Sequence, residues 1–173
     1  MIEKLVAIAS SEVGVREIGG NNRGDRIREY QSATDLPSGA WPWCAAFVDW
    51  CIREWIEIPQ VAMWLNLQRR TPDDWRPKTA LAYGLTAWAR QRPNTTRILT
   101  ERAPALPGDI VTFDFSHVGF VVSESRGSIQ TIEGNTNGRG DRDSESGDGV
   151  WLKVRKKTLV KDLIRINASM STR

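Results

Sequence analysis

Hydrophobic residues recur at helical spacing through the first half of the chain. Leu5, Ile8 and Ala9, for example, are spaced by one helical turn, and this first pattern stops at Gly14. Similar patterns follow as far as residue 91, shortly before Pro93. We therefore expect helices over residues 2–13, from 24 or 25 to 32, from about 42 through 55, and over 79–91, with a short helix at 61–69 inside a mixed stretch.

The second half of the chain changes to short apolar runs that are typical of strands. Residues 134–149 are rich in Gly, Asp, Ser and Arg instead, and predict a long mobile loop. Helices followed by antiparallel strands indicate an α+β fold, with the N-terminal helices packed on an antiparallel sheet of about five strands. The strands are expected over residues 109–113, 117–123, 128–133, 150–154 and 163–166.

The length of 173 residues suits one domain, expected over residues 1–166 with a frayed tail at 167–173. The net charge of +3 fits an anionic polymer such as bacterial cell wall as a partner. It is too small to indicate a nucleic-acid binder, which would depend on many phosphate contacts. The densest basic run alternates with Leu152 and Val154 and predicts the solvent-facing side of a strand; it consists of Lys153, Arg155, Lys156 and Lys157.

The N-terminal segment does not have the pattern of a secretory signal. Glu3 is acidic, and the apolar stretch around it is short and interrupted. No apolar run approaches the ~20 residues that a membrane-spanning helix needs. The sequence thus predicts a protein that is made in the cytoplasm and has no membrane span.

Cys44 is the first candidate for a reactive side chain. It falls near the amino end of the third predicted helix, where the helix dipole and free N–H groups favour a thiolate and can stabilise an oxyanion. The alternative is a small buried hydrophobic residue, which describes most free cysteines. Cys51 lies seven residues later, ~10 Å along a helix. That separation disfavours a disulfide, and we expect Cys51 to be inert core.

His117 is the only histidine of the chain and begins an apolar strand. A thiol nucleophile needs a base, and that base needs a third polar group to orient it. Glu133 and Asn135 are both candidates for that group, and the alternative for them is to satisfy loop N–H groups at a strand end. Gly119 would leave open space beside the imidazole, since it lies two residues along the same strand face.

Two tryptophans, Trp41 and Trp43, flank the thiol among eight in the whole chain. Their rings combine a large apolar surface with one hydrogen-bond donor. They are candidates for substrate binding along a groove. The alternative is that they pack the start of the helix against the sheet.

Four segments together resemble the CHAP domain, the cysteine, histidine-dependent amidohydrolase/peptidase family. They are Trp43-Cys44-Ala45-Ala46-Phe47-Val48, Pro107-Gly108-Asp109-Ile110-Val111, Ser116-His117-Val118-Gly119-Phe120-Val121-Val122 and Glu133-Gly134-Asn135-Thr136. The resemblance covers most of residues 1–155 and implies a papain-like α+β fold that cleaves amide bonds in peptidoglycan. It implies Cys44 as nucleophile, His117 as base, Glu133 at the third catalytic position and Asn135 at the fourth.

The sequence departs from some CHAP lysins in the residues that precede the cysteine. Trp43 stands where those proteins have glutamine, and residues 38–41 contain no acid, so neither a calcium site nor any other metal or cofactor is expected. The second oxyanion donor is open between Asn22 and Tyr30. The acids of the predicted loop lack the glycine of an EF-hand and indicate a solvated segment that could cover a groove; they are Asp141, Asp143, Glu145 and Asp148.

The resemblance predicts a peptidoglycan hydrolase that works through a thioester, either an N-acetylmuramoyl-L-alanine amidase or a stem or cross-bridge endopeptidase. The alternatives are a papain-like amidase for a small soluble amide and a non-catalytic cell-wall binding module. The expected place of action is the cell wall or periplasm, after release or delivery. An endolysin would need a holin as partner, whereas an antibacterial effector would need a secretion system and an immunity protein.

Overall fold

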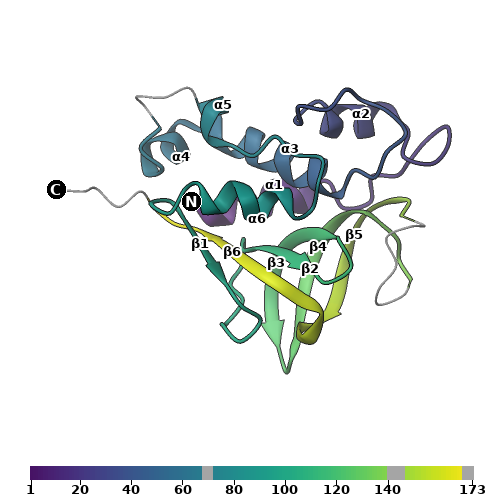
Figure 1. Ribbon diagram of the computed structural model, residues 1–173. Helices are drawn as coiled ribbons and strands as arrows, with labels where there is room; N and C mark the ends of the chain where they lie inside the picture. Colours follow the sequence, from purple (N-terminus) through teal and green to yellow (C-terminus); the bar gives the residue numbers. More distant parts are fainter. Residues whose placement is uncertain (68–71, 140–146, 169–173) are drawn as a thin grey trace.

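The computed structural model describes residues 1–67, 72–139 and 147–168. Helices precede strands along the chain, and they gather on one side of the sheet (Figure 1). The helices are α1 (Ile2–Ser11), α2 (Asp25–Gln31), α3 (Cys44–Ile56), α4 (Pro59–Trp64), α5 (Pro72–Trp75) and α6 (Gly84–Arg90). The strands are β1 (Thr96–Leu99), β2 (Ile110–Phe113), β3 (Val118–Ser125), β4 (Ser128–Thr136), β5 (Gly149–Lys156) and β6 (Val160–Ile166), with a 3₁₀ turn at Lys157–Leu159.

The strands form one antiparallel sheet in the order β1-β6-β2-β3-β4-β5. This confirms the predicted α+β class but corrects the strand count, because six strands form where about five were expected. The strand that the sequence did not reveal is β1, whose four residues include only two apolar ones. Pairing with β6 at the sheet edge holds β1 in place, and such long-range pairing leaves little local signal.

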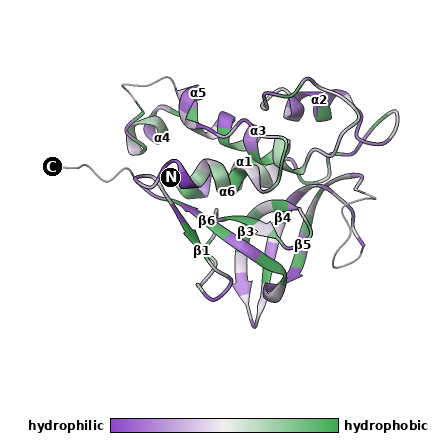
Figure 2. Cartoon of the chain, viewed as in Figure 1, coloured by the Kyte–Doolittle hydropathy of each residue, from purple (hydrophilic) through white to green (hydrophobic). Residues whose placement is uncertain are grey.

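Helix α3 lies at the centre of the hydrophobic core. Figure 2 shows hydrophobic residues concentrated where the helices meet the sheet. Phe47 of α3 meets Phe120 of β3 edge to face, at 6.4 Å between ring centroids. Trp55, also on α3, is fully buried and donates its indole N–H to the Met1 carbonyl at 3.0 Å. These contacts fix α3, and with it the position of its first residue, Cys44.

Several helix boundaries differ from the prediction because tertiary contacts replace the helical pattern. Helix α6 begins at Gly84 rather than near Thr79, whose N–H donates to the buried Asp49 carboxylate at 2.6 Å. The expected helix at 61–69 is α4, which ends at Trp64, and residues 68–71 lie outside the described part of the chain. The predicted loop at 134–149 is shorter, since β4 continues to Thr136 and β5 starts at Gly149.

Strand β5 faces the opposite way from the prediction. Arg155 is fully buried and Lys153 nearly so, whereas Leu152 and Val154 are 48% and 64% exposed. The register explains this, because Lys153 pairs opposite Thr131, on the face of β4 that also carries Glu133. Two residues of the run predicted to face solvent are thus buried, and one of them, Arg155, pairs with Glu133 on the neighbouring strand, whereas Lys156 is exposed as predicted.

Candidate active site

Cys44 is the first residue of α3, so the helix begins two residues later than the predicted start near Pro42. Trp43 precedes it as the N-cap, and the Trp43 carbonyl accepts the N–H of Phe47 at 2.9 Å. The first N–H groups of a helix have no partner within the helix, so they concentrate positive charge there. The Cys44 side chain is 6% exposed. A thiol at this point meets both a positive helix end and a small opening to solvent.

His117 is held at the end of the turn between β2 and β3. Ser116, with φ at +58°, turns the chain, and its N–H donates to the Tyr83 hydroxyl at 2.9 Å. The Tyr83 hydroxyl in turn donates to the Phe113 carbonyl at 2.9 Å. The rings of Phe113 and Phe115 lie nearly parallel to the imidazole, at centroid distances of 6.1 Å and 5.8 Å. The imidazole is therefore fixed by its turn and by aromatic neighbours, and it is fully buried.

The imidazole lies between a thiol and a carboxylate. Nε2 of His117 is 2.9 Å from Oε2 of Glu133, and the Cys44 side chain interacts with the same ring. Neither ring nitrogen has a well-directed hydrogen bond among the described residues, so we describe the contact with Glu133 as an ion pair. Catalytic hydrogen bonds are often poorly aligned before substrate binds. Since Nε2 faces Glu133, Nδ1 is the ring nitrogen that is available to interact with Cys44.

The charges around His117 favour its protonated form. Burial is the largest single influence and lowers the pKa of the imidazole, as expected for a cation removed from water. The interactions with Cys44 and then with Glu133 together outweigh burial and raise the pKa of His117 to about 9. An imidazolium is therefore the form of His117 that this site stabilises at neutral pH.

Glu133 is a buried carboxylate with a full set of partners. Nε and Nη2 of Arg155 donate to it at 2.9 Å and 2.5 Å, and the Thr131 hydroxyl donates at 2.5 Å. Burial acts to raise the pKa of Glu133, but Arg155 and His117 outweigh it and lower that pKa to about 2. Gly119 is needed here, because a Cβ at that position would lie 2.6 Å from the Glu133 Cγ. The space expected beside the imidazole is thus occupied by Glu133.

Asn135 contacts the start of α3 instead of the imidazole. Its φ of +54° lies at an irregularity of β4 that re-aims the side chain. Its Oδ1 accepts the Trp43 N–H at 3.2 Å, and its Nδ2 donates to Asn22 at 2.9 Å. Of the two candidates for orienting His117, the structure places Glu133 against the ring. Asn135 ties the Trp43–Cys44 segment to the sheet.

The two flanking tryptophans differ in their surroundings. Trp43 is fully buried, lies 5.4 Å from Tyr30 in a stacked arrangement and donates its indole N–H to Glu17 at 2.8 Å. That environment fits the packing alternative and removes the ring from direct contact with a substrate. Trp41 is only half-buried and donates to the Pro37 carbonyl at 2.9 Å. Trp41 is therefore the one whose ring remains open to a ligand.

The two candidates for a second oxyanion donor are also separated by their partners. The Tyr30 hydroxyl donates to Glu12 at 2.6 Å, so its proton is already committed. Burial, helped by Glu12, raises the pKa of Tyr30 and keeps it neutral. Asn22 accepts a hydrogen bond from Asn135, which places it one side chain away from the start of α3. Asn22 is the better placed of the two.

Sequence reasoning missed Arg155 and Phe115. The guanidinium of Arg155 lies 5.5 Å from the Phe113 ring centroid and 5.4 Å from that of Phe115, in addition to its ion pair with Glu133. Alternation alone suggested that the basic run faced solvent. A usable signal was available, however, because a carboxylate that is buried needs a cation or several hydrogen-bond donors to remain charged.

The acids of the loop predicted at 134–149 are described only in part. Asp141, Asp143 and Glu145 lie outside the described residues, as does the tail from residue 169. Asp148 accepts the indole N–H of Trp151 at 2.7 Å. In the described ranges, no three His, Cys, Asp or Glu side chains come together as metal ligands. Nor does any helix there have the length and apolar character needed to cross a bilayer.

Comparison with known proteins gives the fold and the family of the chain. No curated protein matches the chain. A solved structure titled "The crystal structure of Ly7917" matches with a TM-score of 0.54 and 14% identity, over 96% of this chain and 62% of the other, which indicates a shared fold. This chain therefore spans less than two thirds of that protein. A model of the CHAP domain matches residues 36–135, more than half of the sequence, and the chain therefore belongs to the CHAP domain family, a family of peptidoglycan amidase- and peptidase-type hydrolases.

Proposed function

We propose that this protein cleaves an amide bond of peptidoglycan, with Cys44 as nucleophile, His117 as general base and acid, and Glu133 as the group that orients His117. One observation carries the proposal: the thiol at the first residue of α3 interacts with an imidazole that is ion-paired to a buried carboxylate. This is the arrangement of nucleophile, base and orienting group that covalent catalysis requires. Family membership supports the same class of substrate.

In the proposed reaction, the Cys44 thiolate attacks the carbonyl carbon of the amide while His117 is protonated. A tetrahedral intermediate forms, and the proton of His117 passes to the departing amine as the C–N bond breaks. The acyl group remains on sulfur as a thioester. Neutral His117 then removes a proton from water as the oxygen of that water adds to the thioester. The C–S bond breaks, the carboxylic acid leaves, and the Cys44 thiolate and protonated His117 are restored.

The negative oxygen of each tetrahedral intermediate needs hydrogen-bond donors. The Cys44 N–H at the start of α3 is one candidate, because the first N–H groups of a helix have no internal acceptor. Asn22 is the second candidate, since its contact with Asn135 holds it near the same helix end. We assign to Asn135 the task of holding the Trp43–Cys44 segment, through its hydrogen bond from the Trp43 N–H.

Arg155 completes the proposed mechanism without touching the substrate. It keeps Glu133 charged, and Glu133 in turn favours the imidazolium that pairs with the thiolate. Arg155 acts in this way as a positioning residue. Since His117 is fully buried and Cys44 is 6% exposed, the sulfur is the group that the substrate meets first.

The test is digestion of purified sacculi and of defined muropeptides, with mass spectrometry of the new amine and carboxyl ends. Cys44→Ser should retain the fold and reduce the rate by at least ~100-fold, as expected for the loss of a covalent nucleophile. Cys51→Ala, a thiol removed from the same helix, is the matched control and should retain activity. A Cys44→Ser protein that digests sacculi as fast as wild type contradicts the mechanism. Cleavage of small soluble amides alone would instead favour the alternative substrate class.

The place of action belongs to the same proposal. A peptidoglycan hydrolase must reach the cell wall, by release as an endolysin or by delivery as an antibacterial effector. The products of the digestion would also separate a muramoyl–alanine amidase from a stem or cross-bridge endopeptidase. An amidase leaves the amino group of alanine free, whereas an endopeptidase leaves new ends within the peptide.

A further inference from the structure

A cleft of about 690 Å³ lies beside α2, apart from the buried His117–Glu133 pair. Its walls come from residues 16–28, from Gln31, and from residues 38–40 just before the start of α3. Among the described residues that line it, four are arginines, while Asp25 is the acidic one. The arginines are Arg16, Arg23, Arg26 and Arg28. The lining therefore has an excess of positive charge.

Two of these arginines are neutralised by acids of the protein itself. Arg26 donates to both oxygens of Glu12, at 2.9 Å and 2.7 Å, and also forms an ion pair with Glu29. Arg28 forms an ion pair with Asp25. In the part of the chain that the structure describes, Arg16 and Arg23 have no ion pair. The uncompensated charge of the cleft therefore belongs to these two residues.

Arg16 is held in a position that suits a planar anion. Its guanidinium carbon lies 3.5 Å from the centroid of the Trp151 ring, and its Nη1 is buried with no hydrogen-bond partner among the described residues. A guanidinium stacked on an aromatic face presents its N–H edge, which matches both oxygens of a carboxylate. Arg16 is half-buried and lines the cleft, so a carboxylate in the cleft would meet a fixed positive charge.

The cleft is connected to the candidate nucleophile through Asn22. Asn22 lines the cleft and accepts a hydrogen bond from Asn135 at 2.9 Å. Asn135 accepts the N–H of Trp43, the residue before Cys44, at 3.2 Å. The nearby acid Glu17 accepts hydrogen bonds from Asn22 and Trp43. A ligand in the cleft would thus lie two hydrogen bonds away from the segment that carries the thiol.

We propose that Arg16 and Arg23 bind a carboxylate of the substrate's peptide portion, and so place the adjacent amide at Cys44. This inference rests on the proposed function, because an acidic peptide is the substrate part that such a cleft would recognise. Arg23 is exposed and can close on a ligand, whereas Arg16 is fixed by Trp151. The cleft then determines which substrates are chosen, and the thiol performs the reaction.

The experiment measures binding without turnover. Cys44→Ala protein is titrated calorimetrically with a soluble muropeptide that carries free carboxylates, and with the same muropeptide after conversion of those carboxylates to amides. We expect the free acid to bind more tightly, and Arg16→Gln or Arg23→Gln to weaken its binding roughly 10-fold each, as for loss of a charge-assisted hydrogen bond. The amidated muropeptide should bind equally to the parent and to both variants.

Arg97→Gln is the control, because it removes the same charge from an exposed residue of β1, at the opposite edge of the sheet from β5. Arg23 is also exposed, so Arg23→Gln should leave the melting temperature unchanged and exclude unfolding as the cause of weaker binding. Equal binding of the free acid by the parent and both arginine variants would overturn the proposal. Binding that depends on the arginines, in a protein whose wild type cleaves nothing, would leave this site standing and refute the proposed function.

Discussion

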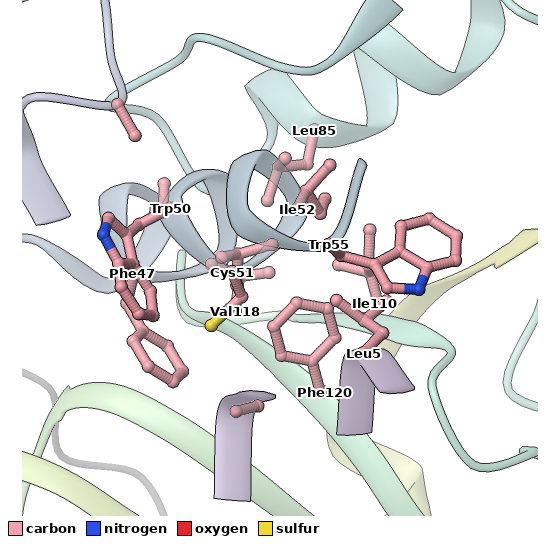
Figure 3. Packing of buried hydrophobic residues seen from close by; sticks show 14 of the residues in the cluster. Leu5, Phe47, Trp50, Cys51, Ile52, Trp55, Leu85, Ile110, Val118 and Phe120 are labelled. Atoms are coloured by element: carbon pink, nitrogen blue, oxygen red, sulfur yellow. The ribbon is translucent and has the colours of Figure 1, made fainter. Parts of the chain in front are cut away.

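Two cysteines of α3 show how the same side chain meets different surroundings within one helix. Cys44 is the first residue of the helix, 6% exposed and next to His117. Cys51 is fully buried, and Figure 3 shows its sulfur pointing from α3 into a cluster of apolar side chains. Burial, followed by the nearby charge of Glu12, raises the pKa of the Cys51 thiol well above its usual value. Both thiols are free, so their difference comes from their neighbours alone.

The two thiols share one helix, and they differ in the part of the sheet that each of them faces. The start of α3 meets a polar end of the sheet, where His117, just before β3, lies beside Glu133 of β4, which pairs with Arg155 of β5. Two turns later the same helix meets Val118 and Phe120 (Figure 3). A thiol that faces a charged pair can become a nucleophile, and one that faces apolar side chains remains protonated.

The largest expected difference between the two thiols is in their reactivity. With native protein at pH 7, iodoacetamide should modify Cys44 at least ~100-fold faster than Cys51, because only exposed thiolates react readily. Peptide mass spectrometry over time measures both rates in one sample. His117→Ala should slow the modification of Cys44 and leave Cys51 unchanged. Equal modification rates at Cys44 and Cys51 in folded protein would contradict the expected difference in reactivity.

The second test removes Arg155, the buried cation at the polar end of the sheet. Arg155→Met should lower the free energy of unfolding by about 3–5 kcal/mol, the usual effect of leaving a buried charge without its partner. Chemical denaturation followed by tryptophan fluorescence gives the value.

The double variant Arg155→Met/Glu133→Gln is the control for that measurement. It removes the unpaired charge as well and should be more stable than Arg155→Met alone. A double variant that is less stable by the sum of the two single effects would contradict the proposed pairing. In either variant, loss of activity should exceed what the change in folded fraction explains.

The free energy of unfolding should depend on pH through His117 and Glu133, which lie at the same end of the sheet. The pKa of His117 rises from an ordinary 6.5 to about 9 in the folded protein, so its contribution is complete below pH 6.5 and is lost as the pH rises through 9. Glu133, with its pKa lowered from 4.5 to about 2, stabilises above pH 4.5 and loses that contribution as the pH falls through 2. Melting temperatures between pH 6 and pH 10 test the His117 window. The decline should be shallower in His117→Gln, and an unchanged decline would exclude His117 as its source.

The smallest expected effect is at the apolar thiol. Cys51→Ala removes one buried sulfur and should lower the free energy of unfolding by roughly 1–2 kcal/mol, through lost burial and a small cavity. Denaturation curves measure the loss, and digestion of sacculi should proceed at the wild-type rate at temperatures where the variant is folded. A large loss of activity in folded Cys51→Ala would mean that the two thiols are not distinct in role.

The sequence by itself determined the α+β class and the placement of Cys44 near a helix start, and it left His117 as the one candidate base, since the chain has no other histidine. Helical and strand periodicities are local, so they can be read without knowing the fold. The alternation of the strand also made Glu133 and Asn135 candidates for orienting His117, and the family resemblance implied the third and fourth catalytic positions for them.

Only the tertiary structure decided which partner each of these side chains takes. Glu133 reaches His117 and Asn135 reaches Trp43 because an irregularity of β4 separates their directions. Arg155 points inward because pairing between β4 and β5 sets which face of the strand is buried. Strand register depends on residues far apart in the chain, and a shift by one residue reverses every side chain. The order of polar and apolar residues therefore specifies that a strand forms, while its neighbours decide which side becomes the interior.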